Sequence, residues 1–157
     1  MTEDHEKLRE YFAAQSDISF AYLFGSRAKG TARSDSDWDV AVWLNTDDPY
    51  DRLTRRLDLQ SELSRSLGGE VDVVDLRSAT PLLWNEVIQA RGLLWSGNPL
   101  RQAQWELRAI GEYLDWLPYH RRYASALLAR LTKKAGEGND QPGVGGDSPW
   151  NVNPVRG

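Results

Sequence analysis

Cysteine is absent from the 157-residue chain, and histidine occurs only at His5 and His120. The absence of cysteine excludes disulfide frameworks, thiolate zinc sites and cysteine nucleophiles. No histidine triad can be built convincingly from these two residues, and we expect both to lie at the surface. An excess of basic residues is also absent: 19 Lys and Arg face 23 Asp and Glu, with a pI of about 5.2. This balance argues against a protein that mainly binds nucleic-acid phosphates, so no direct nucleic-acid partner is expected.

Long apolar runs are absent as well. No uncharged apolar stretch reaches the ~18 residues that a membrane span requires, and the opening sequence MTEDHEKLR lacks the apolar core of a signal peptide. We therefore expect a cytoplasmic protein with no membrane partner. With 40% apolar and 27% charged residues, the composition is that of an ordinary globular chain.

Apolar runs bounded by turn residues predict the strands. Residues 18–24 (ISFAYLF) form such a run and stop at Gly25, and residues 39–44 (DVAVWL) form a second. Residues 70–76 (EVDVVDL) alternate carboxylates with valines, which is typical of a third strand. A short apolar segment at 92–95 is a candidate fourth strand.

Helical periodicity fills the spaces between these runs. We expect helices over 3–14, over 50–67 with Gly68 and Gly69 at its end, and over 80–92 with Thr80 and Pro81 at its start. The segment between Gly25 and the second strand is rich in small and polar residues, and we expect a turn and a short helix there.

A last helical piece is predicted over 100–133. Two apolar rows run along it, one with Trp105, Ala109 and Tyr113 and the other with Leu107, Ile110, Leu114 and Leu117. Two such rows predict burial on two sides. Pro118 removes a backbone donor, so we expect it to break or kink this helix.

Together these elements predict an α/β fold. We expect a small mixed, twisted sheet with helices packed on one face and C-terminal helices that close the domain. The predicted division is a catalytic core over 1–98, a helical extension packed on it over 99–134, and a disordered tail over 135–157, which is rich in glycine and proline.

The segment from Gly25 to Asp39 contains the residues expected of a site that binds phosphate and a metal ion. Gly25 follows a buried strand, where a glycine lets the backbone approach a ligand, and the hydroxyl of Ser26 lies beside backbone N–H groups that favour an anion. Asp37 and Asp39 enter the next strand with Trp38 between them, so both carboxylates point to one face. Two adjacent carboxylates repel each other, and Mg²⁺ removes that repulsion.

A third carboxylate would allow a second metal ion ~3.5–4 Å from the first, the arrangement used in nucleotidyl transfer. Asp72 supplies it, because it lies between Val71 and Val73 and points away from them. Glu70 shares the face of Asp72, but Asp72 lies deeper in the strand. Asp75 points to the other face. Asp35 also precedes Asp37 at the same spacing, and we expect it in the loop as a solvated turn residue.

The residues GSRAKGTARSDSDWD, followed by EVD, resemble the minimal nucleotidyltransferases of the polymerase-beta type. The hallmark of that family is Gly-Ser, a ten-residue gap and Asp-x-Asp, and the spacing here matches completely. The resemblance implies that Gly25 and Ser26 hold the nucleotide phosphates and that Asp37 and Asp39 bind two Mg²⁺ ions. It also implies that Asp72 completes the metal cage and acts as base toward the acceptor. Arg27, Lys29 and Arg33 add positive charge nearby without an assigned role.

Two later segments, PLLWNEVIQARGLLWSG and WELRAIGEYLDWLP, look similar to the C-terminal part of MntA-type antitoxins. These are small adenylyltransferases paired with HepT toxins, which are HEPN-type ribonucleases. The resemblance implies transfer of AMP from ATP to a tyrosine hydroxyl of a cognate HepT-like toxin, within a hetero-oligomer of the two proteins. The region from Trp105 to Tyr123 is our first choice for the surface that docks the toxin.

Two alternatives stay open at this point. The first is transfer of a nucleotide to a small-molecule hydroxyl, as in antibiotic-modifying relatives, although 157 residues leave little room for a dedicated small-substrate domain. The second alternative is an antitoxin that neutralises its partner by binding alone. The presence of all three carboxylates argues against that reading.

Overall fold

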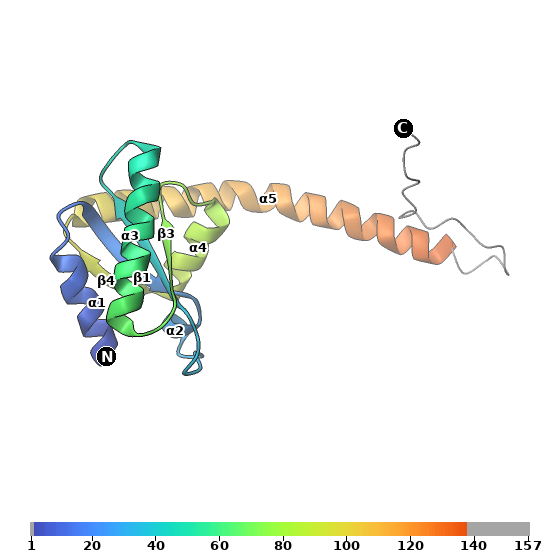
Figure 1. Cartoon of the computed structure of the whole chain (residues 1–157). Helices are drawn as coiled ribbons and strands as arrows, with labels where there is room; N and C mark the ends of the chain where they lie inside the picture. Colours follow the sequence, from blue (N-terminus) through green and yellow to red (C-terminus); the bar gives the residue numbers. More distant parts are fainter. Residues whose placement is uncertain (1, 138–157) are drawn as a thin grey trace, which may run out of the picture. The chain divides into compact units, whose positions relative to one another are not determined.

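The computed structural model describes residues 2–137 (Figure 1). Along the chain the elements are α1 (Glu3–Ala13), β1 (Ile18–Phe24), α2 (Gly25–Lys29), β2 (Trp38–Leu44), α3 (Pro49–Leu67), β3 (Val71–Asp75), α4 (Pro81–Ala90), β4 (Gly92–Ser96) and α5 (Pro99–Glu137). The predicted strands and helices are all present, including the short fourth strand and the short helix after Gly25. Their ends differ from the predicted ones by a few residues.

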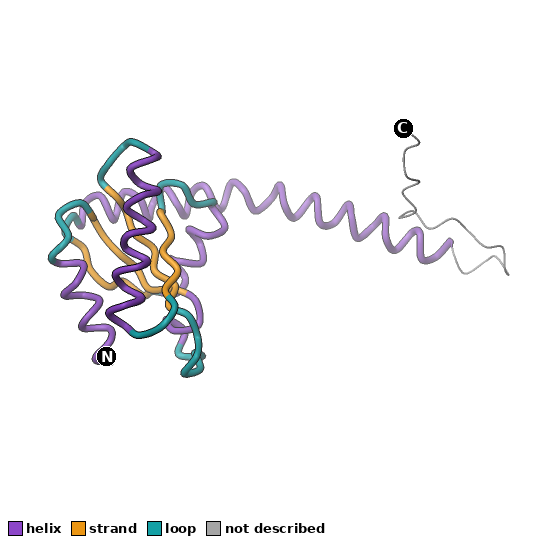
Figure 2. The backbone as a smooth tube through the Cα atoms, in the orientation of Figure 1, coloured by secondary structure: helices purple, strands orange, loops and turns teal. Residues whose placement is uncertain are grey.

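The four strands form one mixed sheet in the order β3-β2-β1-β4 (Figure 2). Strand β1 is antiparallel to both β2 and β4, whereas β2 and β3 are parallel. Phe24 at the end of β1 therefore pairs with Asp39 near the start of β2, and Asp39 pairs in turn with Asp72 near the start of β3. This topology brings the end of one strand and the beginnings of two others to the same end of the sheet.

Helices cover both faces of the sheet. On one face, α1 and α3 bury Leu8, Phe12, Leu59 and Leu63 against alternate residues of the strands. On the other face, α4 and the first part of α5 bury Trp84, Val87, Trp105 and Ala109. The sequence predicted core helices on one face and C-terminal helices that close the domain. In the structure, α4 lies on the opposite face from α1 and α3, together with the first part of α5. All seven residues of β1 are buried, so neither of its faces can be left in water.

The chain separates into two compact units, Met1–Leu117 and Pro118–Gly157. The sequence predicted that Pro118 breaks or kinks the last helix. Pro118 lies inside α5, so the helix is not broken there. A proline removes a single backbone donor, and on an exposed helix water can solvate the carbonyl group that is released. The division at residues 98 and 134 stays a prediction, and most of the predicted tail, residues 138–157, lies outside the described residues.

The two apolar rows of α5 differ in burial. Trp105 is 3% exposed and Ala109 is fully buried, as predicted. Leu107, Ile110 and Leu114 are 73%, 46% and 58% exposed, so the expected burial on two sides is wrong for these three residues. Leu117, in the same row, is half-buried. Within residues 2–137, the other three side chains of the row are among the exposed large apolar ones. No helix in the same range, α5 included, is long and apolar enough to cross a membrane.

Candidate active site

Gly25 joins the buried strand β1 to the short helix α2. Its φ of +67° lies in the left-handed region that favours glycine. A Cβ atom at this position would overlap the carboxylate of Asp39, with the Asp39 Cγ only 3.0 Å away. The residue is therefore glycine for two separate reasons, and the predicted Gly-Ser turn lies directly against one of the predicted aspartates. Ser26 follows in the first turn of α2 and is half-buried.

The three predicted aspartates gather at this end of the sheet. Asp39 and Asp72 are paired residues on the parallel strands β2 and β3. Asp37 immediately precedes β2 and lines, together with Glu70 and Asp72, a hollow of about 490 Å³. Trp38, between the two aspartates of the Asp-x-Asp motif, is buried in the core under α1 and α3. The predicted alternation along this segment is confirmed.

The surroundings of Asp39 disfavour its charged form. Burial raises the pKa of Asp39 above its usual value, and the negative charges of Asp72, Asp37 and Glu86 raise this pKa further. Glu86 lies on α4 and was not among the predicted site residues. It is distant in sequence and belongs to no motif, so only the packing of α4 beside α2 reveals it.

The site has the donor chemistry of a magnesium centre, since Mg²⁺ prefers carboxylate oxygens. Within residues 2–137, however, no three Asp, Glu or His side chains converge closely enough to hold a metal ion as they stand. Asp37 and Asp72 are exposed, whereas Asp39 is half-buried and its carboxylate lies against Gly25. Coordination of an ion therefore requires the two exposed carboxylates to turn toward Asp39.

Two further carboxylates that the sequence offered lie elsewhere. Asp35 occupies an exposed turn in the loop before β2, as predicted. Asp75 is 7% exposed and accepts hydrogen bonds from Arg52 Nε at 2.9 Å and from the Ser78 hydroxyl at 2.8 Å. Asp75 thus has a structural role at the end of β3, and it faces away from the Asp72 carboxylate.

Arg27 connects α2 to the loop that carries Asp37. Its Nε and Nη2 atoms donate to the carbonyl oxygen of Ser36 at 2.9 and 2.5 Å, and its guanidinium lies 4.1 Å above the ring of Trp38. Ser36 and Trp38 flank Asp37 in the chain. Arg27 therefore holds both neighbours of one site carboxylate, a role that the sequence did not indicate.

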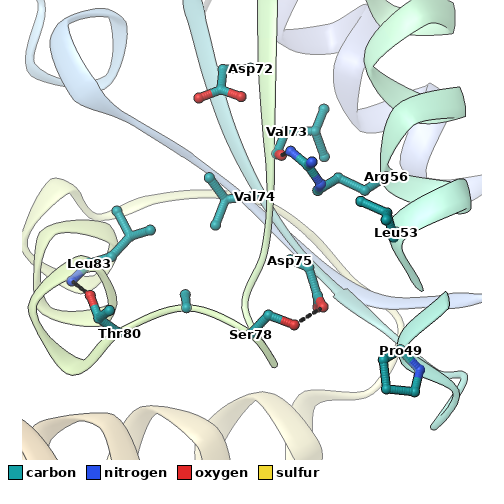
Figure 3. Close-up of a pocket in the computed structure, with 11 residues that line it drawn as sticks. Pro49, Leu53, Arg56, Asp72, Val73, Val74, Asp75, Ser78, Thr80 and Leu83 are labelled. Carbon is teal, nitrogen blue, oxygen red and sulfur yellow. Dashed lines mark hydrogen bonds between the residues drawn. The ribbon is translucent and has the colours of Figure 1, made fainter. Parts of the chain in front are cut away.

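Beside Asp72, a hollow of about 480 Å³ runs along the open edge of β3 (Figure 3). Its apolar lining comes from α3, β3, α4 and the segment before α4, with Pro49, Leu53, Val74, Ala79 and Leu83. Arg56 lies over this edge and donates from Nη1 to the carbonyl oxygen of Val73 at 3.2 Å. The carboxylate of Asp72 can thus be approached from the edge of the sheet.

Comparison with known proteins places this site in a family. Residues 6–99 match the family described as "Polymerase beta, Nucleotidyltransferase". The chain is 31% identical to the protein adenylyltransferase MntA of Shewanella oneidensis over 121 residues, which cover 77% of this chain and 84% of that protein.

Solved structures agree with the sequence comparison. A toxin–antitoxin crystal structure with AMP-PNP matches with a TM-score of 0.64 and 25% identity, covering 81% of this chain and 99% of that one. The structure of a tri-AMPylated Shewanella oneidensis HEPN toxin in complex with an MNT antitoxin matches with a TM-score of 0.59 at 23% identity. That match covers 79% of this chain and 98% of the other, and it is a likeness of fold. The chain belongs to the polymerase-beta-type nucleotidyltransferase family and, within it, to the MntA-type adenylyltransferases.

Proposed function

We propose that this chain transfers AMP from ATP to a tyrosine hydroxyl of a cognate HepT-like HEPN ribonuclease in the cytoplasm, and so acts as its antitoxin. The observation that carries the proposal is the placement of Asp39 against the Gly25 turn and beside Asp72. The activity named for the MntA relative and the AMP-PNP bound in the toxin–antitoxin structure support the choice of nucleotide and partner.

The residues have separate roles in this proposal. The backbone of Gly25 and Ser26 binds the phosphates of ATP, because the N–H groups at the start of α2 favour anions. Asp37, Asp39 and Asp72 hold Mg²⁺, with two ions expected. Bound Mg²⁺ neutralises phosphate charge and lowers the pKa of an acceptor hydroxyl.

Asp72 is the proposed base. Its exposed carboxylate takes the proton of the tyrosine hydroxyl, and the phenolic oxygen then attacks the α-phosphorus of ATP. A bond forms between this oxygen and the α-phosphorus, and the bond from the α-phosphorus to the bridging oxygen breaks. Pyrophosphate leaves with that oxygen. Asp37 and Asp39 keep the reacting groups aligned, which supplies much of the rate enhancement in phosphoryl chemistry.

The partner is proposed to reach the site over the C-terminal helix. We assign catalysis to residues 1–98 and docking to the extension over 99–134, centred on Trp105 to Tyr123. The exposed row Leu107, Ile110 and Leu114 supports this choice, because apolar side chains left in water favour association. The acceptor tyrosine would enter along the hollow beside Asp72 (Figure 3).

The intact mass of the partner tests the function. We expect the protein encoded next to this gene to gain mass in AMP-sized steps after incubation with this chain, ATP and Mg²⁺, and no gain with an Asp37→Asn/Asp39→Asn variant. Tight binding without a mass gain would replace catalysis by neutralisation through binding alone. Absence of any binding would favour the small-molecule alternative.

The metal can be tested separately. Adding Mg²⁺ is expected to raise the Tm of the chain, since the ion removes the repulsion among Asp37, Asp39 and Asp72. The measurement is thermal unfolding with and without millimolar MgCl₂, with EDTA as reference and NaCl of equal ionic strength to correct for screening. A Tm increase of the same size in Asp37→Asn/Asp39→Asn would mean that the ion binds elsewhere.

Arg27→Lys tests whether the loop must be held. Lysine keeps the charge but loses the two hydrogen bonds to Ser36 and the stacking on Trp38. We expect AMP transfer to fall about 10- to 100-fold, because misplacing a group by about 1 Å can have an effect of that size. Arg33→Lys is the matched control, since Arg33 contacts Ser36 through its backbone N–H and carbonyl oxygen, which lysine keeps. Equal losses in both variants would contradict a specific role for Arg27.

A further inference from the structure

A second hollow lies near the other end of β2. Trp43, Asp47, Arg77, Arg101, Gln104, Trp105 and Arg108 line a volume of about 290 Å³, and an adjoining volume of about 380 Å³ also reaches Arg52 and Trp84. Trp43 is four residues beyond Asp39 on the same strand, which separates their backbones by about 13 Å at the usual rise of ~3.3 Å per residue. None of the proposed catalytic residues lines either volume.

The inner wall of this hollow contains a guanidinium that is already fixed in place. Arg77 donates from Nη1 to the carbonyl oxygens of Leu44 at 3.3 Å and Thr46 at 2.7 Å, and it lies over the ring of Trp43 at 5.5 Å. Its Nη2 atom donates to the exposed carboxylate of Asp47 at 2.6 Å, a contact that an incoming anion would displace. Arg52 is similarly held, by the carbonyl oxygen of Asp47 at 2.7 Å and by buried Asp75. Positive groups fixed in this way need little reordering to receive an anion.

The outer rim comes from α5. Arg101, Gln104 and Arg108 follow helical spacing and are all exposed. Arg108 pairs with Glu112 at 2.6 Å, but a pair this exposed contributes little and exchanges readily. The guanidinium of Arg101 makes a long contact of 3.5 Å to the side chain of Asn45. Both rim guanidiniums can therefore turn toward a ligand.

The charge of the hollow is positive although the chain as a whole carries −4. Asp47 is the one acidic residue among those that line it, and its side chain is 92% exposed. Arg77, followed by Arg52 and Arg101, lowers the pKa of the Asp47 carboxyl. The guanidiniums thus stabilise the negative charge of Asp47 at the edge of the hollow.

Two residues that line the hollow also have buried donors without acceptors. The indole N–H groups of Trp43 and Trp105 are buried and have no hydrogen-bond partner within residues 2–137. A buried donor without an acceptor is unfavourable by about 1–3 kcal/mol, so such groups are uncommon unless they serve a ligand or a water molecule.

We propose that this hollow is a second anion site, which binds a phosphate dianion or the phosphate group of a monoester at Arg77, Arg101 and Arg108. Among the lining residues, these three guanidiniums and Asp47 sum to a net charge of +2. A phosphate dianion that displaces Glu112 from Arg108 neutralises this charge, whereas a single carboxylate does not. The planar fork of arginine matches two phosphate oxygens at once. The site is separate from the proposed ATP site and does not depend on the proposed function.

Titration of the full chain with inorganic phosphate tests the proposal. The experiment is done in EDTA at constant ionic strength, and binding is followed by calorimetry and by the fluorescence of the tryptophans. We expect Arg101→Ala/Arg108→Ala to weaken phosphate binding at least tenfold. The exposed positions of both residues should leave Tm nearly unchanged. Arg121→Ala/Arg122→Ala, which removes the same charge from the same helix outside the hollow, should bind as the parent does.

Three results would overturn the proposal. One is equal phosphate affinity in the parent and in Arg101→Ala/Arg108→Ala. Another is an equal loss in the Arg121→Ala/Arg122→Ala control, which would indicate general attraction to positive charge. The third is an equal response to acetate at the same concentration, which would remove the preference for phosphate. Titration with AMP then distinguishes the sources: binding as tight as that of free phosphate indicates that the site accepts the phosphate of a nucleotide.

Discussion

Gly25→Ala is expected to lower AMP transfer by at least about 100-fold and to destabilise the chain. The new Cβ would overlap the Asp39 carboxylate, so either Asp39 or the turn must move. A displacement of about 1 Å in a reacting group is enough for a loss of this size. The left-handed backbone adds about 1–2 kcal/mol of strain for alanine. Transfer rates and denaturant unfolding measure the two effects.

Gly30→Ala is the matched control for this substitution. Gly30 has nearly the same backbone conformation, with φ of +71°, but no atom lies within 4 Å of a Cβ built on it. We therefore expect Gly30→Ala to lose stability through strain while keeping most of the transfer activity. If the two variants lost activity equally, strain in the loop would explain the result and the contact with Asp39 would not.

Asp39→Asn is expected to reduce transfer by about 1,000-fold, since loss of a metal ligand removes several kcal/mol of transition-state stabilisation. At neutral pH the same variant should have a higher Tm than the parent. Burial and three nearby carboxylates raise the pKa of Asp39, so its charged form is disfavoured in the folded chain. Replacing the charge by a neutral amide removes this unfavourable contribution.

The stabilisation should depend on pH with a definite sign. Below the ordinary pKa of 3.8, Asp39 is protonated in both the folded and the unfolded chain, and the variant gains nothing. As the pH rises through the raised pKa of the folded state, the parent loses stability relative to the variant. Thermal unfolding of both proteins from pH 3 to pH 7, without added metal, measures the difference. Asp35→Asn, in an exposed turn, should change neither Tm nor activity, and a parent more stable than Asp39→Asn at pH 7 would contradict the argument.

Local patterns carried most of the information about this fold. The apolar runs predicted the strands because a buried strand is built from consecutive apolar residues. Thr80 and Pro81 predicted the start of α4 because threonine caps a helix N-terminus and proline is favoured in its first turn. The alternation of Asp37, Trp38 and Asp39 also follows from strand geometry alone. These features depend on neighbours in the chain, and a sequence displays them directly.

The features that the sequence did not predict depend on contacts between distant residues. Glu86 joins the carboxylates only because α4 packs near α2, and the stacking of Arg27 on Trp38 requires the loop between them to fold back. The exposed row at Leu107 has the periodicity of a core helix. Periodicity shows that a row of a helix is apolar, but it does not tell whether the same chain buries that row. For the same reason, nothing in the sequence marked the arginine-lined hollow.

The guanidinium of Arg56 over the carbonyl of Val73 has a consequence for behaviour at high concentration. Strand β3 ends the sheet, and unpaired backbone groups on a terminal strand are a template on which a strand of another molecule can be added. A charged side chain that occupies one of these carbonyl oxygens, next to the carboxylate of Asp72, makes such addition unfavourable. The same arrangement that leaves the site open to a partner's side chain thus protects the protein against aggregation through its sheet.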